Sequence, residues 1–146
     1  MGANKGFKKN TYFKTWKDQQ YSTTFWVIIT KPGQLNDAST MFKEITGEDY
    51  EIADKSQALC FDRFNTKSGQ HVIFFFQEDN SAGTVVHEAI HAKNYVFAHH
   101  GVKLDMDNDE HEAYYTDYIV REILDAYHQL DIATSKKKKM KNARKT

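Results

Sequence analysis

The run at residues 85–92 constrains the fold of this chain more than any other segment. It is apolar except at His87, Glu88 and His91. Residues four apart lie one turn apart on the same face of an α-helix, so the two imidazoles can converge on a single ion. A helix that is apolar on nearly all sides is normally buried, and buried histidines are destabilising unless a partner pairs with them. We therefore expect a buried helix in which a divalent cation supplies that pairing.

The same residues have the order His-Glu-x-x-His, which is the arrangement found in zinc peptidases. A glutamate directly after the first histidine can take a proton from a water bound to the metal. The motif thus predicts zinc held by His87 and His91, with Glu88 as general base. The competing interpretation is a pair of hydrogen-bonded core histidines beside an exposed glutamate, because so short a motif also arises by chance.

Strands are expected in three places. Aromatic and β-branched residues predict them at 25–30, 58–63 and 71–77, and the turn-forming composition of 65–69 predicts that the last two form a hairpin. Capping residues and stop signals predict a short helix at about 36–45 and the motif helix from residue 80 or 81 to about 100.

A last helix is expected from about residue 107 to about 132, with acidic residues in its first turn. This order of elements predicts an α+β fold. A short sheet of about three strands would pack on the motif helix and on the helix that follows it, as in zincin peptidases. In that fold the strand nearest the site binds the substrate backbone by pairing along its free edge, and the strand at 72–76 is the candidate here.

The formal net charge of zero hides a strong partition, because 12 of the 20 Lys and Arg residues lie at the two ends of the chain. We therefore expect a basic N-terminal arm at 1–20, one domain at 21–133 and a basic C-terminal tail at 134–146. Such ends are usually solvated, and they also suit nonspecific contact with nucleic acid or with an acidic protein. The tail has no aromatic residue for base stacking, so sequence-specific readout is not expected.

Other sequence features narrow the class of protein. No run approaches 18 consecutive apolar residues, so no contact with a membrane is expected. Cys60 is the single cysteine, which excludes an internal disulfide, and no secretory signal peptide opens the chain. An intracellular protein, or one carried inside a particle, fits these features best.

A catalytic zinc normally has a third protein ligand besides a water. His99 and His100 lie roughly 12 Å or more beyond His91 along the same helix, too far to share its ion. Asn94 stands where the extended metzincin motif has a glycine. The third ligand is therefore expected among the acids at the start of the last helix, and spacing alone does not select one of them.

The sequence HEAIHA at 87–92, a short linker and DEHEAY at 109–114 together resemble small zinc peptidases encoded by tailed bacteriophages. In that family the second motif reads Glu-x-x-Ala-Tyr, which is similar to the Glu-x-x-Ala of gluzincins. The resemblance covers roughly residues 84–124. It implies Zn2+ as cofactor, Glu110 as third metal ligand, and Ala113 as the small residue that lets the two helices approach closely.

Two positions qualify this resemblance. Tyr114 stands where gluzincins commonly have an aspartate that orients the first histidine, and Asp117 is the alternative for that role. A helical wheel also places Glu112, rather than Glu110, on the apolar stripe of the last helix, so Glu112 stays open as the ligand. Tyrosines or a histidine that could assist at the oxyanion are also left open: His111, Tyr114, Tyr115 and Tyr118.

The resemblance implies a zinc-dependent metallopeptidase that acts on a peptide or protein substrate, in a bacterial host cytoplasm or a phage virion. The alternative is a phage structural or assembly protein on a zincin scaffold. Its zinc site would be structural or vestigial, and its basic ends would anchor it to DNA or to other phage structural proteins. A regulatory protease that cuts one repressor is a third interpretation, but no DNA-reading helix-turn-helix is evident.

Overall fold

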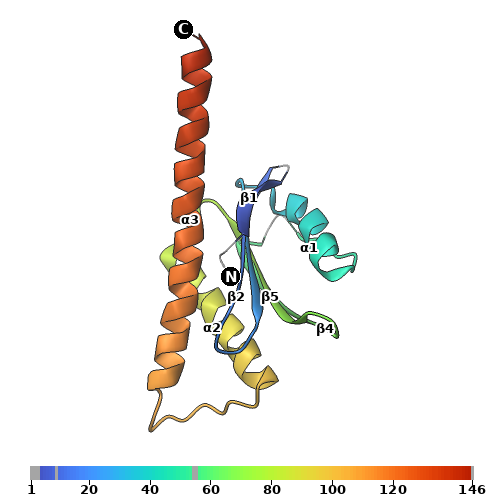
Figure 1. Cartoon of the computed structure of the whole chain (residues 1–146), viewed down its shortest axis with the longest axis vertical. Coiled ribbons are helices and arrows are strands. Elements are labelled where there is room, and N and C mark those ends of the chain that lie inside the picture. The colour runs from blue at the N-terminus through green and yellow to red at the C-terminus, as the bar shows by residue number, and fades with distance from the viewer. Residues whose placement is uncertain (1–3, 9, 54–55, 146) are drawn as a thin grey trace.

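The computed structural model describes the chain except residues 1–3, 9, 54–55 and 146. It is a mixed α+β fold in which helices cover both faces of one sheet (Figure 1). The five strands lie in the order β1-β2-β3-β5-β4. Their bounds are β1 Asn4–Lys8, β2 Thr11–Lys17, β3 Thr24–Thr30, β4 Ala58–Asn65 and β5 Gly69–Gln77. Neighbouring strands are antiparallel except β3 and β5, which are parallel.

A single-turn helix η1 (Leu35–Ala38) and helix α1 (Ser39–Thr46) cover one face of the sheet. Helices α2 (Ala82–His99) and α3 (Glu110–Lys145) cover the other. Strand β5 supplies both cores, because Ile73 and Phe75 face α1 while Val72, Phe74 and Phe76 face the α2 side. A strand covered on both faces has no polar face, which is why this segment is apolar without interruption.

The expected α+β class is confirmed, but the sheet has five strands rather than about three. The two additional strands, β1 and β2, come from the segment expected as a basic arm, and they belong to the same sheet as the other three. Tyr12, Lys14 and Trp16 alternate along β2 and are all buried. Because Lys14 is charged, the sequence does not show that these three positions form one buried face. The aliphatic stem of Lys14 lies on the core face while its amine reaches acidic residues of α3, Glu122 and Asp125.

The other expected elements are confirmed, and their ends differ by a few residues except at the C-terminal end of α3. The Ser81 hydroxyl accepts the Thr84 N–H at 3.3 Å and begins α2. Gly47 and Gly101, with φ of 76° and 68°, follow α1 and α2 in the left-handed conformation that glycine adopts without strain. Strands β4 and β5 form the expected hairpin.

The expectation that the strand at 72–76 offers a free edge is wrong. Strand β5 lies between β3 and β4, and the edge strand beside it is β4. The apolar run of β5 was itself the sign of a central strand, because an edge strand in a soluble domain usually carries charge. Strand β4 does carry charge, at Asp62 and Arg63.

The segment expected as a separate C-terminal tail continues α3 as helix to Lys145. The last buried residue of α3 is Leu130, and the helix beyond it projects away from the domain (Figure 1). Within the described part of the chain, no helix is both long enough and apolar enough to cross a membrane.

Candidate metal centre

The two histidines of the motif lie one turn apart on α2 and point toward each other. The Nε2 atoms of His87 and His91 are 3.2 Å apart, and their ring centroids are 4.8 Å apart. Two imidazole nitrogens bound to the same tetrahedral zinc at 2.0–2.1 Å would be about 3.3 Å apart. The pair therefore has the spacing that a shared zinc ion requires. One N–H···N hydrogen bond would also have this length, which is the competing interpretation.

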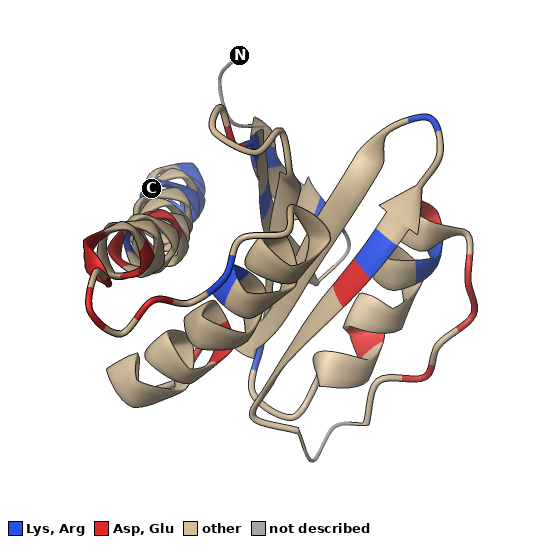
Figure 2. Ribbon diagram, turned by 90° about the horizontal axis from the view of Figure 1, so that it is seen from below, with Lys and Arg blue, Asp and Glu red and all other residues tan. Residues whose placement is uncertain are grey.

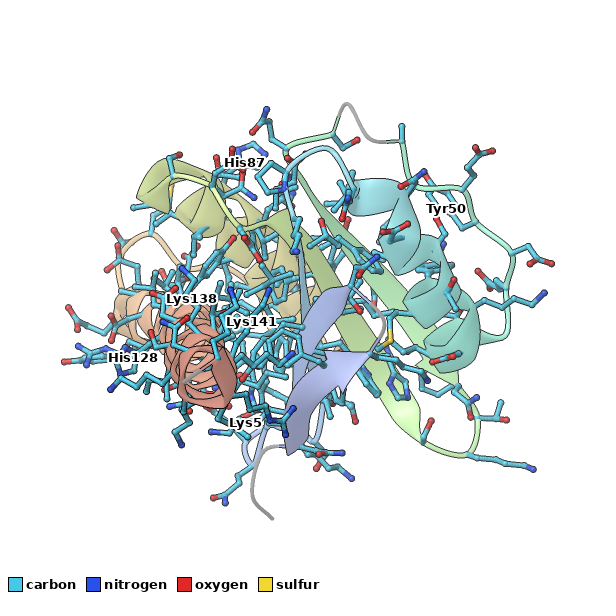
Figure 3. The ribbon with its side chains drawn as sticks, turned by 90° about the horizontal axis from the view of Figure 1, so that it is seen from above. Lys5, Tyr50, His87, His128, Lys138 and Lys141 are labelled. Carbon is cyan, nitrogen blue, oxygen red and sulfur yellow. The ribbon has the colours of Figure 1, made fainter. Side chains whose placement is uncertain are left out.

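The expectation that both histidines are buried is wrong. His87 and His91 are exposed, as are Val86 and Ile90 beside them, with 41% and 43% of their surface accessible. Helix α2 turns a different face inward, and its small residues let it lie close to the sheet. The buried apolar residues of that face are Val85, Ala89, Ala92, Val96 and Phe97. The histidine pair therefore lies at the surface, among exposed apolar side chains. Figure 3 shows His87 near the periphery of the domain, well apart from the end of α3.

Glu88 is the buried member of the motif, with 8% of its surface exposed. Burial raises the pKa of its carboxyl group, whereas the nearby His87 and His91 lower it. Among the described residues, none donates a hydrogen bond to this carboxylate. The buried polar side-chain atoms without a partner in the described part of the chain are Thr30 Oγ1 and Asn80 Oδ1, so the Glu88 carboxylate keeps some contact with solvent.

The side chain of Glu88 lies close to the inner face of β4. Burial raises the pKa of the Cys60 thiol, and the negative charges of Glu88 and Asp62 raise it further. Cys60 and Asp62 alternate along β4 on the side that packs against α2. Helix α2 thus presents its histidines to solvent and its glutamate to the edge strand of the sheet.

The structure does not bring Glu110 to the histidine pair. Glu110 is exposed at the first position of α3. The neighbouring His111 ring stacks on Phe97, near the end of α2, with centroids 5.4 Å apart. Phe97 lies about 9 Å beyond His91 along α2, at 1.5 Å per residue. Within the described ranges, no three His, Cys, Asp or Glu side chains gather closely enough to hold a metal.

Glu112, the alternative ligand, forms an ion pair with the amine of Lys93. The Lys93 side chain is 3% exposed and that of Glu112 is 30% exposed. This pair explains why a glutamate lies on the apolar stripe of α3. Lys93 was missed as a buried residue, although it follows Ala89 by one turn and so shares the buried face of α2.

The remaining candidates of the last helix have other partners. Asp117, considered for orienting the first histidine, pairs with Arg121 on the exposed side of α3. Tyr115 donates a hydrogen bond to Asp18 at 3.0 Å, and His111 contacts the hydroxyl of Tyr21 at 2.5 Å.

Burial raises the pKa of Tyr118 to about 12, and the Tyr118 hydroxyl accepts a hydrogen bond from the indole of Trp16. Tyr114 is 71% exposed. None of these contacts involves the histidine pair. The contacts with Trp16, Asp18 and Tyr21 join the first turns of α3 to β2 and to the β2–β3 connection instead.

Comparison of the chain with protein-family models, with curated proteins and with solved structures gives no match. The geometry of α2, β4 and the first turns of α3 is therefore what the functional interpretation depends on.

Proposed function

We propose that this protein is a zinc-dependent metallopeptidase with a zincin-like arrangement of α2, α3 and β4. The observation that carries the proposal is the 3.2 Å separation of the His87 and His91 Nε2 atoms, which fits two ligands of one zinc ion. Glu110 is the third ligand that the resemblance to phage peptidases implies. Zinc held there would polarise the carbonyl group of a bound peptide and lower the pKa of a bound water.

Glu88 is the proposed general base. Its carboxylate accepts a proton from the attacking water and returns it to the amine that leaves. Its position beside β4, with part of its carboxylate in contact with solvent, supports this role. A carboxylate already held by several donors would be a weaker base.

The proposed substrate is an extended peptide that pairs with β4. An edge strand has unpaired N–H and C=O groups, and an extended chain can add to it as a further strand. Strand β4 is at the edge of the sheet and packs against α2. A peptide on this edge would pass alongside the helix that carries Glu88. The exposed Val86 and Ile90 offer apolar contacts near the histidines.

A second candidate function is a structural or assembly protein with a structural or vestigial zinc site. One observation favours it: Glu110 is not gathered with the histidines, which leaves two protein ligands where catalytic zinc normally has three.

Zinc analysis and a peptide-cleavage assay test the proposal together. We expect about one zinc per chain after zinc-supplemented expression, and at least a tenfold loss of affinity in His87→Ala and in His91→Ala. His128→Ala is the matched control, because His128 is exposed on α3. Less than a tenth of an equivalent of zinc in the wild type would overturn the metal site.

The variant Glu88→Gln separates binding from catalysis. It should keep the zinc and abolish cleavage, because it removes a base without removing a ligand. Cleavage at the wild-type rate would show that Glu88 is not the base. Bound zinc with no cleavage of any peptide by the wild type would favour the second candidate function.

A further inference from the structure

The C-terminal part of α3 is a strongly charged surface that the proposed peptidase site does not use. We call residues 134–145 the basic arm. Every residue of the basic arm is exposed, and no acidic residue follows Asp131. Figure 2 shows acidic residues along the start of α3 and basic residues toward its far end. The cations are Lys136, Lys137, Lys138, Lys139, Lys141, Arg144 and Lys145.

These cations surround the helix instead of forming one stripe. Successive residues of an α-helix are about 100° apart, so four consecutive lysines point to four sides. Met140 is the exposed large apolar residue of the basic arm, at 59%. Because the formal net charge of the whole chain is zero, attraction to a polyanion would come from this local concentration of charge.

We propose that the basic arm binds double-stranded DNA by lying in the major groove and contacting phosphates on both of its walls. A helix with its side chains is roughly 10–12 Å across, and the major groove of B-form DNA is about 12 Å wide. Cations on all sides of a helix suit this position, because a helix in the groove has phosphates on two flanks. Phosphates would also relieve the repulsion among neighbouring lysines.

Other anionic partners fit the basic arm less well. A helix that lies on a membrane needs a continuous apolar face, which the basic arm lacks. A protein interface needs apolar or aromatic anchors at its centre, and lysine is depleted there. Single-stranded nucleic acid is held by stacking on aromatic residues, and residues 134–145 contain none. The major groove of A-form RNA is too narrow for a helix.

Lysine carries a point charge and makes few base-specific contacts, so the binding should be independent of DNA sequence. The structure also joins the two basic ends of the chain at the start of the arm. Lys5 on β1 donates a hydrogen bond to Gln129 at 2.6 Å, and the Lys137 amine lies 3.4 Å from the centroid of the Phe7 ring. In Figure 3, which looks onto the C-terminal end of α3, Lys138 and Lys141 lie at that end of the helix and Lys5 lies below it, beside β1. Strand β1 thus supports the arm and adds a further cation near it.

The test measures binding of the full chain to two unrelated 20-base-pair DNA duplexes between 50 and 200 mM salt by fluorescence anisotropy. Each phosphate contact contributes about −0.9 to the slope of log K against log salt. A variant with four arm lysines changed to glutamine should reduce that slope by about 2 to 4, and both duplexes should bind the wild type within about twofold. The substitutions are Lys136→Gln, Lys137→Gln, Lys138→Gln and Lys139→Gln.

The matched control removes the same charge from exposed lysines elsewhere in the domain. It carries Lys17→Gln, Lys31→Gln, Lys67→Gln and Lys103→Gln. It should keep the wild-type slope within about 1. Thermal unfolding checks that both variants are folded, and Glu88→Gln should bind DNA as the wild type does, which separates this inference from the proposed peptidase activity.

Three results would overturn the inference. A wild-type slope in the variant of the four arm lysines would show that the basic arm is not the DNA site. Tighter binding to polyglutamate than to the duplex, at equal charge concentration, would indicate an acidic protein partner. Tighter binding to vesicles that contain phosphatidylserine would indicate a membrane surface.

Discussion

The part of α3 that packs on the domain and the basic arm belong to one helix but are held in different ways. The packed part has buried residues at helical spacing: Tyr115, Ile119, Ile123, Ala126 and Leu130. The basic arm has none. Tertiary packing supplies most of the stability of helices in proteins, whereas a helix without packing depends on weak residue preferences and is marginal at this length. Continuity of a helix therefore does not make its two parts equally stable.

The two parts of α3 also differ in charge: the packed part carries acidic residues and the basic arm carries lysines and an arginine. Acids of the packed part pair with lysines that are buried elsewhere in the domain. Lys14 of β2 pairs with Glu122 and Asp125, and Lys93 of α2 pairs with Glu112. The partition of charge along the sequence thus separates the acids that hold α3 in place from the lysines that it carries outward.

The largest difference between the two parts should appear on truncating an apolar side chain. Ile123 is fully buried, so Ile123→Ala should lower the free energy of unfolding by about 2–4 kcal/mol, through lost burial and the cavity left behind. Met140→Ala in the basic arm is the control and should change it by less than about 0.5 kcal/mol. Urea unfolding measures both. Equal effects would mean that the arm is packed in solution.

The ion pair between the helices gives the next largest effect. Glu112→Ala would leave the buried amine of Lys93 unpaired and should lower the free energy of unfolding by about 1–3 kcal/mol. This is below the range for fully buried pairs because the Glu112 side chain is 30% exposed. Glu110→Ala, at an exposed position of the same helix turn, should cost less than about 0.5 kcal/mol. Similar losses in the two variants would contradict the pairing.

The same two positions test the metal site. If the resemblance to phage peptidases holds, Glu110→Ala should weaken zinc binding at least tenfold, because a charged ligand is lost. Glu112→Gln, which keeps the side-chain shape, should leave zinc affinity nearly unchanged. Titration against a competing chelator measures both. Loss of zinc in the Glu112 variant alone would show that Glu112, and not Glu110, is the third ligand.

Deleting residues 134–146 should have the smallest effect on stability. We expect the free energy of unfolding to change by less than about 0.5 kcal/mol, because every described residue removed is exposed. In the full chain, amides of the basic arm should exchange with solvent far faster than those between Tyr115 and Leu130. Slow exchange in the arm without DNA would show that the contact of Lys137 with Phe7 is enough to stabilise it.

Much of the fold can be predicted from local sequence patterns. The remaining features depend on contacts between residues that are distant in the sequence. Strand β5 and helix α2 are predictable because their apolar runs and caps are local. Strand β2 is not, because Lys14 looks solvent-exposed until Glu122 and Asp125, more than 100 residues later, are brought beside it. The position of β4 at the edge depends on the pairing of β3 with β5, which spacing does not reveal.

The candidate site divides in the same way. The approach of His87 to His91 follows from helix geometry alone. Their exposure does not, because the packing of Ala89 and Ala92 on the sheet decides which face of α2 is buried. The position of Glu110 depends on where the loop after α2 places the first turn of α3. That placement is decided by tertiary packing and not by local sequence.

The parallel pairing of β3 with β5 also has a consequence for how the chain folds. The contact of Thr23 with Gln70 in this region spans 47 residues, whereas the β1–β2 and β4–β5 hairpins close short loops. Closing long loops costs more chain entropy, so non-local pairing tends to form late and slows folding. Helix α3 packs against β2 and β3, and α2 packs against β4 and β5. The two helices also pack directly on each other. Closure of the central pair of strands brings both halves of the sheet beneath them, and we expect that closure to be the rate-limiting step of refolding.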